Sequence, residues 1–280
     1  MGVLFMIVAK NISKVYNNKI TALDEFELSI GQGLFGLLGP NGSGKTTFMR
    51  IITTLLKPTK GTVEVCGNDV MKQPDAVRRL IGYVPQEFGL PKKLTVTEFL
   101  DYVAILKGIK STKERIKQID YVVQNLSLEE FCKRKIWALS GGMKQRVGVA
   151  QALLGKPKVL IVDEPSVGLD PKERVNLRNL LGEISTTAAV ILSTHIVEDV
   201  QASCSNMAVI NNGKIVYYGS PEKLRELAKG KVWSLSLTNS EFQEIKQLYR
   251  VTATKTKGSQ IIARVLSGSH PLGKGTMVEP

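Results

Sequence analysis

The sequence predicts an α/β protein with a largely parallel β-sheet, a helical insert and a small α+β extension. Continuous apolar runs at residues 34–38 and 159–162 are typical of parallel strands that are buried on both faces. Helical segments alternate with such runs along most of the chain, as in α/β folds. The 280 residues suffice for one large core, expected at residues 1–220, and an appended unit at 221–280.

The first part of the chain is expected to form a β-sheet that is solvated on one face. Runs at residues 3–8 and 22–30 flank a turn at Asn17-Asn18. The second run alternates between apolar and polar residues, as antiparallel strands with one solvent-exposed face do. Its apolar residues are Leu23, Phe26, Leu28 and Ile30.

The alternation of strands and helices begins after this sheet. The buried strand at 34–38 leads into a helix over 45–56, which is expected to stop before Pro58. Short strands are expected at 61–66 and 80–84, each followed by turn residues.

Residues from about 92 to 140 are predicted to form a helical subdomain. Thr95, Ser111 and Ser127 each precede a glutamate by three positions, the spacing of a capping box that opens a helix. Two apolar stripes at helical spacing are expected to be core contacts: Phe99, Leu100, Val103 and Leu106, then Ile116, Ile119, Val122 and Val123.

The α/β pattern resumes after this subdomain. Asp170, then Pro171, then Glu173 combine an N-cap, a proline at the first helical position and an acidic first turn, so a helix starts there. Asn212-Gly213 favours a hairpin turn. The expected strands are 159–162, 189–193, 207–210 and 214–218.

The last unit, residues 221–280, is expected to be a basic α+β module. It carries ten Lys and Arg against four Asp and Glu from residue 223 on. We expect it to act in docking, membrane proximity or regulation, with an ordinary stabilising module as the alternative. Its expected elements are helices at 221–229 and 240–249 and strands near 233–237, 250–256 and 260–266.

The net charge leaves several kinds of partner open, whereas the cysteine spacing indicates the compartment. The formal net charge of +13 fits a solvated basic surface, an anionic nucleotide, the inner face of a membrane or nucleic acid, and does not choose among them. Cys66, Cys132 and Cys204 match no zinc or disulfide-exchange spacing, which favours a reducing, cytosolic compartment.

No apolar run approaches the roughly 18 residues that a membrane span needs. The apolar start, residues 1–9, is interpreted as a buried strand because it lacks a basic n-region and a cleavage site. Any membrane role is therefore expected to come through a partner.

A phosphate-binding loop is predicted between a buried strand and a helix. In Gly39-x-x-x-x-Gly44-Lys45-Thr46 the glycines let backbone N–H groups approach the β- and γ-phosphates of a nucleotide. Lys45 supplies charge for the phosphate oxygens, and the Thr46 hydroxyl suits Mg²⁺. The expected nucleotide contacts are Gly39, Pro40, Asn41, Gly42, Ser43, Gly44, Lys45, Thr46 and Thr47.

Two carboxylates follow the apolar strand at 159–162. Asp163 ends this strand, so it is expected to face the phosphates and complete the Mg²⁺ shell. Glu164 points differently and suits a general base that aligns water on the γ-phosphate. Phosphoryl transfer mainly needs positioning and charge neutralisation, which these groups supply together with Lys45.

Three further residues become candidates beside this loop. Gln86 follows a strand, and its amide can contact both Mg²⁺ and water; viewed alone, the residue fits a surface glutamine better. His195 also follows a strand and can hydrogen-bond a γ-phosphate, with a capping or surface histidine as the alternative. Tyr16 can stack on a purine ring or be buried.

Ser140, Gly141 and Gly142 open a second helix that is suited to binding an anion. The chain contains no second phosphate-binding loop. A second copy of the chain is therefore expected to supply the nucleotide for this helix.

These elements resemble the nucleotide-binding subunit of ABC transporters over roughly residues 5–220. Met143 departs from the glutamine that is commonest in the family's signature motif, but its side chain is not expected to touch phosphate. The matching segments are 39–47 for Walker A, 159–163 with Glu164 for Walker B and the catalytic glutamate, 139–143 for the signature, Gln86 for the Q-loop, 166–170 for the D-loop, His195 for the H-loop and Tyr16 for the adenine-stacking aromatic.

The resemblance implies a P-loop NTPase (RecA-like) core with an antiparallel β subdomain and a helical subdomain. It implies that two subunits pack head to tail, with ATP between residues 39–47 of one and 140–142 of the other. The roles it implies are catalysis by Glu164, His195, Gln86 and Lys45, and Mg²⁺ binding by Thr46, Gln86 and Asp163.

The appended unit also resembles that of bacterial drug, antibiotic or lipid exporters whose membrane subunits are separate chains. Such a subunit is expected to be cytoplasmic and bound to transmembrane permeases at the inner face of the membrane. Tails of this kind often run on past a sequence like that of 278–280, where this sequence stops, which suggests truncation.

The alternative is a soluble ABC ATPase that acts on nucleic acid or ribosomes. The net charge of +13 is compatible with it. Such proteins typically carry tandem modules, a zinc insertion or a long coiled coil, and the sequence shows none of these. No nucleic-acid partner is therefore expected.

Overall fold

The computed structural model describes residues 5–17, 19–86, 89–271 and 275–279. By contacts, the chain divides into two units, residues 1–220 and 221–280, which are described separately. No helix in the described part of the chain is long and apolar enough to cross a bilayer.

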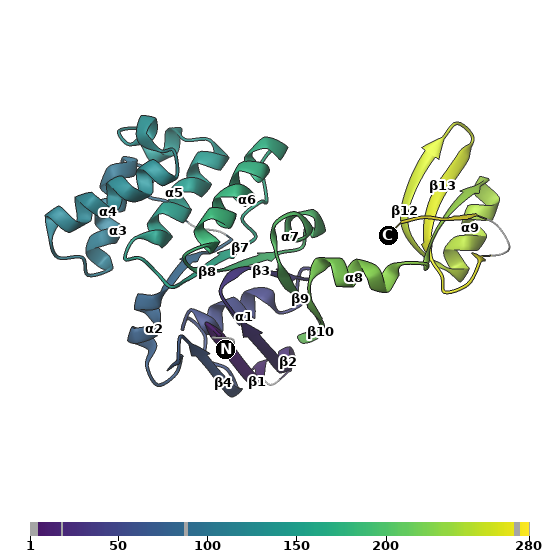
Figure 1. The fold of residues 1–280 in the computed structure, drawn as a ribbon, viewed down its shortest axis with the longest axis horizontal. Coiled ribbons are helices and arrows are strands. Elements are labelled where there is room, and N and C mark those ends of the chain that lie inside the picture. Colours follow the sequence, from purple (N-terminus) through teal and green to yellow (C-terminus); the bar gives the residue numbers. More distant parts are fainter. Residues whose placement is uncertain (1–4, 18, 87–88, 272–274, 280) are drawn as a thin grey trace. The chain divides into compact units, whose positions relative to one another are not determined.

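A six-stranded sheet forms the centre of the first unit (Figure 1). Its strands, in spatial order, are β10 (Lys214–Gly219), β9 (Asn206–Asn211), β3 (Gly33–Leu38), β8 (Ala189–Thr194), β7 (Val159–Asp163) and β6 (Ile81–Val84). All neighbouring pairs are parallel except the β9–β10 hairpin. Every residue of β7 and β8 is buried, as the apolar runs predict.

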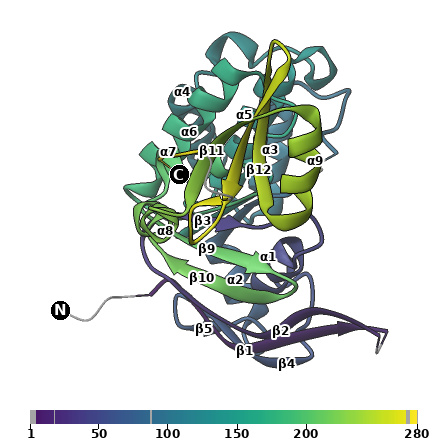
Figure 2. The same cartoon turned by 90° about the vertical axis from the view of Figure 1, so that its right-hand side faces the viewer.

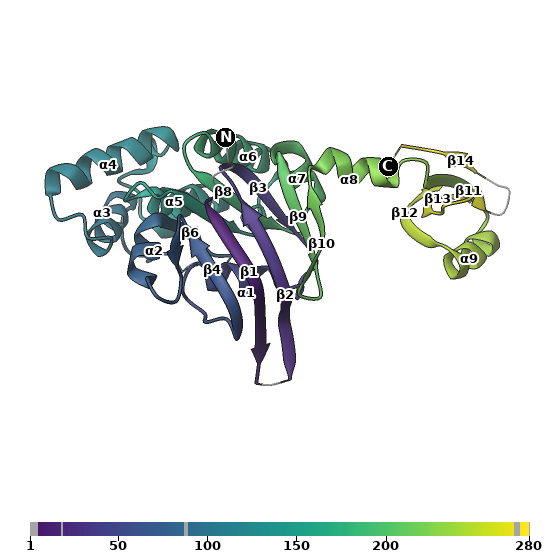
Figure 3. The ribbon, with the colours of Figure 1, turned by 60° about the horizontal axis from the view of Figure 1, so that its bottom comes forward.

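An antiparallel sheet packs against the first one through a helix. Its order is β2 (Ile20–Ile30), β1 (Ile7–Tyr16), β4 (Lys60–Val65) and β5 (Asn68–Asp69), and Figure 3 shows β1 and β2 as its long pair. Helix α1 (Lys45–Ile52) contributes Phe48, whose ring centroid lies 4.5 Å from that of Phe26 on β2. The four apolar residues predicted for the inner face of β2 are buried, which confirms that face.

Two predicted boundaries in this region were wrong. The first strand was expected at residues 3–8 but is Ile7–Tyr16, because it pairs with both β2 and β4. Helix α1 ends at Ile52 instead of residue 56. The Thr53 hydroxyl donates to the Met49 carbonyl, and Thr54 has a φ of 64°, which is not helical. Residues 1–4 and Asn18 of the predicted turn lie outside the described residues.

A short helix, α2 (Pro74–Leu80), was missed by the sequence analysis. It takes Leu80, the expected first residue of a strand, so that β6 begins at Ile81. Seven residues with one buried side chain, Val77, give too short a periodic pattern to predict a helix.

The predicted helical subdomain contains α3 (Val96–Leu106), α4 (Thr112–Asn125) and two short 3₁₀ turns at Glu129–Phe131 and Ile136–Ala138, and α5 (Gly141–Leu153) follows it directly. Most of the two predicted apolar stripes face the core, but Leu106 and Ile116 are exposed, at 67% and 54%. An apolar stripe indicates which side of a helix is non-polar, and it does not say how far a neighbour covers it.

Only one of the three predicted capping boxes is complete. Thr95 accepts from the Glu98 backbone, and the Glu98 carboxylate accepts from the Thr95 backbone. At Ser111 only the first of these bonds forms. Ser127 opens no α-helix: its φ is 50°, and it connects two buried leucines.

Thr95→Ala is expected to lower the free energy of unfolding by about 1 kcal/mol, because it removes the cap of α3. The measurement is urea unfolding followed by circular dichroism. Thr95→Ser keeps the hydroxyl and is expected to stay within about 0.5 kcal/mol of wild type. Equal losses in both variants would contradict a capping role.

Helices α6 (Pro171–Ser185) and α7 (Val197–Ser203) pack on β3 and β8. Asp170 caps α6 as predicted, accepting from the Glu173 backbone at 2.8 Å. The predicted hairpin turn is also confirmed, since Asn212 and Gly213 both have positive φ, 48° and 77°.

The second unit is a four-stranded antiparallel sheet with one packed helix. It contains α8 (Pro221–Ala228), β11 (Val232–Leu237), α9 (Asn239–Leu248), β12 (Arg250–Lys257), β13 (Gln260–Leu266) and the short β14 (Thr276–Met277). Figure 2 shows α9 beside β12, and the strand order is β12-β13-β11-β14. A separate small core lies beneath α9 and includes Trp233 and Leu235. The predicted elements are present, with β14 in addition.

Candidate functional site

The predicted phosphate-binding loop connects β3 to α1. Gly44 precedes the helix with φ of 112°, and a Cβ atom there would meet the Ala22 carbonyl, so the position requires glycine. The Gly39 backbone donates to the Thr194 carbonyl at 3.3 Å, which ties the loop to β8. The loop thus begins at the carboxyl edge of the parallel sheet.

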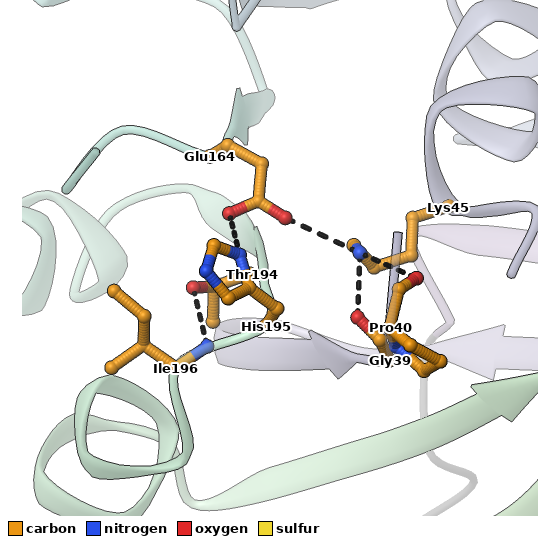
Figure 4. Close-up of polar contacts among 7 residues, drawn as sticks. All are labelled: Gly39, Pro40, Lys45, Glu164, Thr194, His195 and Ile196. Carbon is orange, nitrogen blue, oxygen red and sulfur yellow. Dashed lines mark hydrogen bonds and ion pairs between the residues drawn. The ribbon is translucent and has the colours of Figure 1, made fainter. Parts of the chain in front are cut away.

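Lys45 is folded back into this loop. Its ammonium donates to the carbonyls of Gly39 at 2.6 Å and Pro40 at 3.2 Å, and the residue is only 5% exposed (Figure 4). The two backbone carbonyls therefore hold the Lys45 ammonium next to the phosphate-binding loop, where phosphate oxygens are expected.

The strand order β3-β8-β7 brings the other predicted residues to the same edge. Asp163 ends β7, Thr194 ends β8, and these strands run parallel to β3. Glu164 donates its backbone N–H to Ser193 at 2.8 Å, and its φ of 49° turns the chain at the strand end. Asp163 and Glu164 are neighbours in sequence that take different directions.

Glu164 bridges two other predicted catalytic residues (Figure 4). Its Oε1 lies 3.2 Å from Lys45 Nζ, and its Oε2 lies 2.8 Å from His195 Nδ1. Glu164 is buried, whereas the His195 side chain is 44% exposed. The structure therefore gathers an ammonium, a carboxylate and an imidazole at the point predicted for the γ-phosphate.

Asp163 fits the predicted Mg²⁺ site. It is buried, and neither carboxylate oxygen has a partner at hydrogen-bond geometry. Burial raises the pKa of Asp163, and the nearby hydroxyls of Ser193 and Thr46 act in the opposite direction. A divalent cation would satisfy these oxygens and reverse the cost of burying the charge. One carboxylate and one hydroxyl are donors that Mg²⁺ accepts alongside nucleotide phosphates.

A cleft of about 230 Å³ opens beside the loop. Gln86 and Glu164 lie on its wall, so the structure confirms that Gln86 is near the loop. Ala22 also lines the cleft and was not predicted, because its sequence context carries no binding signal. The remaining lining residues are Asn41, Gly42, Ser43, Gly44, Lys45, Thr46 and Thr47.

Tyr16 is not among the residues that line this cleft. It ends β1, and the Lys14 ammonium lies 5.3 Å from its ring centroid. Stacking on adenine stays a prediction.

The second predicted anion site lies at the start of α5. Ser140 is its N-cap and accepts from the Met143 backbone at 3.2 Å. Ser140 and Gly141 are exposed, and Gly142 lines a different cleft from the phosphate-binding loop, together with Leu169 and Glu173. The structure therefore does not join the two anion-binding elements into one cleft.

Residues 23–167 match the family model described as ABC transporter. The chain belongs to the ABC transporter family. This membership confirms the resemblance found in the sequence and the class of protein it implied, an ATP-binding cassette of the ATPase type.

Two curated relatives in the ABC transporter family are 40% identical to this chain over the residues that align. The uncharacterized ABC transporter ATP-binding protein YxlF of Bacillus subtilis (strain 168) aligns over 201 residues, 72% of this chain and 66% of its own length. The probable multidrug ABC transporter ATP-binding protein YbhF of Escherichia coli (strain K12) aligns over 197 residues, 70% of this chain and 34% of its own. The chain thus spans less than two thirds of either relative.

Solved ABC cassettes have the same fold. A structure of cbiO1 from Clostridium perfringens, described as part of the ABC transporter complex cbiONQ, gives a TM-score of 0.72 at 27% identity, covering 79% of this chain and 90% of that chain. A dimeric ATP-binding cassette in a post-hydrolysis state, bound to ADP and Pi, gives a TM-score of 0.69 at 30% identity. This match covers 77% of this chain and 99% of that chain. These matches confirm the predicted α/β P-loop fold.

Proposed function

We propose that this chain hydrolyses Mg²⁺-bound ATP in a head-to-tail dimer and thereby powers export through separate membrane subunits. The observation that carries the proposal is the convergence of Lys45, Asp163, Glu164 and His195 at one sheet edge. The family membership supports ATP as the nucleotide.

Each residue at this edge has a distinct task in hydrolysis. Lys45 neutralises phosphate oxygens, and Asp163 with Thr46 would hold Mg²⁺, with Gln86 on the cleft wall as the third proposed ligand. Mg²⁺, when bound, supplies positive charge that stabilises the developing charge on the phosphates. Glu164 accepts a proton from the attacking water, and His195 holds Glu164 through Nδ1 and presents its other ring nitrogen to the γ-phosphate.

The head-to-tail dimer is supported by the separation of the two anion-binding elements. Ser140 is exposed at the start of α5 and lines no common cleft with Lys45, so its anion is best supplied by another copy. A dimeric cassette bound to ADP and Pi is among the solved structures with this fold.

The membrane subunits are proposed to contact α3 of the helical subdomain. Tyr102, Ile105 and Leu106 are 51–67% exposed there, which is unusual for such large apolar side chains on one helix. The chain reaches α3 from Gln86, so this surface is linked in sequence to the nucleotide cleft. The subunit would then sit at the cytoplasmic face of the membrane.

Co-purification from membranes tests this proposal. The tagged chain is expected to bring down polytopic membrane proteins and to show Mg²⁺-dependent ATPase activity in the complex. Tyr102→Ser with Leu106→Ser should release these partners while ATP binding persists, and Tyr121→Ser on α4 serves as the control of matched exposure. Recovery of ribosomes or nucleic acid instead would favour the alternative function, which the names of the relatives do not support.

The basic second unit is proposed to act outside the chemistry, at an anionic membrane surface. Among its described residues, none lines the nucleotide cleft, and Lys255 and Lys257 are exposed on β12. Deleting residues 221–280 is expected to leave ATP binding by the first unit intact, because each unit has its own core.

The full chain is expected to co-sediment with phosphatidylserine vesicles and to dissociate as salt rises, since each basic residue near the surface contributes roughly 1 kcal/mol. Lys255→Gln with Lys257→Gln should weaken this binding. Binding that is independent of salt, or absent, would refute the lipid role and leave a stabilising module.

A further inference from the structure

Glu173 places a carboxylate against the start of α5, a contact that its sequence position does not reveal. Its Oε1 lies 3.5 Å from Ser140 Oγ. A Cβ atom added to Gly142 would overlap the carboxylate, so the carboxylate lies directly over this glycine. The first turn of α6 therefore touches two of the three residues proposed to receive a partner's nucleotide.

The position of Glu173 is fixed by the start of its own helix. Pro171 occupies the first turn, and the Glu173 backbone N–H is bound by the Asp170 side chain at 2.8 Å. In a capping box the side chain at this position would turn back to the N-cap backbone. Here the Asp170 side chain accepts from the Glu173 backbone, but the Glu173 carboxylate does not return the bond and faces α5 instead.

The charge of Glu173 is not neutralised by an ion pair. Within the described ranges, no Lys, Arg or His nitrogen lies within 4.0 Å of its carboxylate. Arg146 lines the same cleft, but its guanidinium donates to the Leu126 carbonyl at 3.3 Å. The carboxylate lies at the positive end of the α5 dipole, and a phosphate would use the same end.

We propose that Glu173 opposes ATP-driven dimer closure by placing an anion of the same chain beside the γ-phosphate site. The inference rests on the proposed head-to-tail dimer. A phosphate that hydrogen-bonds Ser140 must come within a few ångströms of the Glu173 carboxylate, where like charges repel. Glu173 thus weakens the closed dimer and favours its reopening.

The test compares dimerisation in a Glu164→Gln background, where ATP is expected to persist. Adding Glu173→Gln, which keeps the side-chain shape, should lower the ATP concentration for half-maximal dimerisation roughly three- to tenfold, as removal of one like-charge contact predicts. Analytical ultracentrifugation measures the dimer. The difference should shrink as salt rises.

Two further variants separate charge from contact. Glu183→Gln makes the same change on α6, at the other end of the same cleft, and should leave dimerisation unchanged. Glu173→Asp keeps the charge but withdraws it from Gly142. Its ATP concentration for half-maximal dimerisation should therefore lie between those of the chains with glutamate and with glutamine at this position. Binding of a fluorescent ATP analogue to the monomer should be equal in all variants.

The outcomes distinguish this inference from the function on which it rests. If the Glu164→Gln chain dimerises with ATP and Glu173→Gln leaves its dimerisation unchanged or weaker, the role of Glu173 is overturned and the proposed dimer stands. If the Glu164→Gln chain stays monomeric at saturating ATP, the head-to-tail dimer fails, and the inference fails with it.

Discussion

Glu164→Gln is expected to reduce ATP turnover by on the order of 10²–10³ while ATP binding persists, because it removes one positioned group from the reaction. Glutamine keeps the side-chain shape but cannot take a proton from water. Lys45 and Asp163, which would hold phosphate and metal, are untouched. The chain should therefore accumulate as an ATP-bound dimer, because reopening follows hydrolysis in the proposed cycle.

Steady-state phosphate release and size-exclusion chromatography with ATP measure these two effects. Glu198→Gln is the matched control, since Glu198 is an exposed glutamate on the neighbouring α7, three residues after His195. It should leave turnover unchanged. Turnover of Glu164→Gln within about threefold of wild type would remove Glu164 from the role of base.

Ser140→Arg is expected to abolish hydrolysis while the monomer binds ATP almost normally. Ser140 lines no common cleft with the phosphate-binding loop of its own chain, so its loss should spare nucleotide binding there. Arginine is too large for a site where two subunits meet across a nucleotide. A fluorescent ATP analogue measures binding, and phosphate release measures hydrolysis.

Mixing two inactive variants tests the geometry. A heterodimer of Ser140→Arg and Lys45→Ala chains contains one site with both elements intact, so a 1:1 mixture should regain about a quarter of wild-type activity if subunits exchange freely. The control mixes Ser140→Arg with a chain that carries both substitutions, where no site is intact. Equal activity in the two mixtures, in steady state and in a single turnover, would contradict the head-to-tail arrangement.

The location of the nucleotide site follows from the sequence because the motifs carry their own structural context. A glycine-rich loop after a buried strand, and a carboxylate at the end of another, must share an edge if both strands run parallel in one sheet. The observed order β3-β8-β7 meets this condition, because both strands pair in parallel with β8 between them. Lys45, Asp163, Glu164 and His195 could therefore be predicted before their distances were known.

Contacts between helices could not be predicted in the same way. Glu173 meets Gly142 only because α6 packs beside the start of α5, a relation that no local pattern encodes. The exposure of Leu106 and Ile116 likewise depends on how far neighbouring helices extend. The failure at Ser127 has a local cause: burial of the adjacent Leu126 and Leu128 outweighs the capping preference of serine and glutamate.

The ion pair between Lys45 and Glu164 makes nucleotide binding an exchange of anions. The lysine has a carboxylate partner at 3.2 Å, and both groups are buried. A phosphate that binds this ammonium competes with that carboxylate, so binding of the nucleotide would free the base that acts on it. The same pairing means that Lys45→Ala leaves the buried Glu164 carboxylate without its ammonium partner, and such a chain should melt at a lower temperature than wild type without nucleotide.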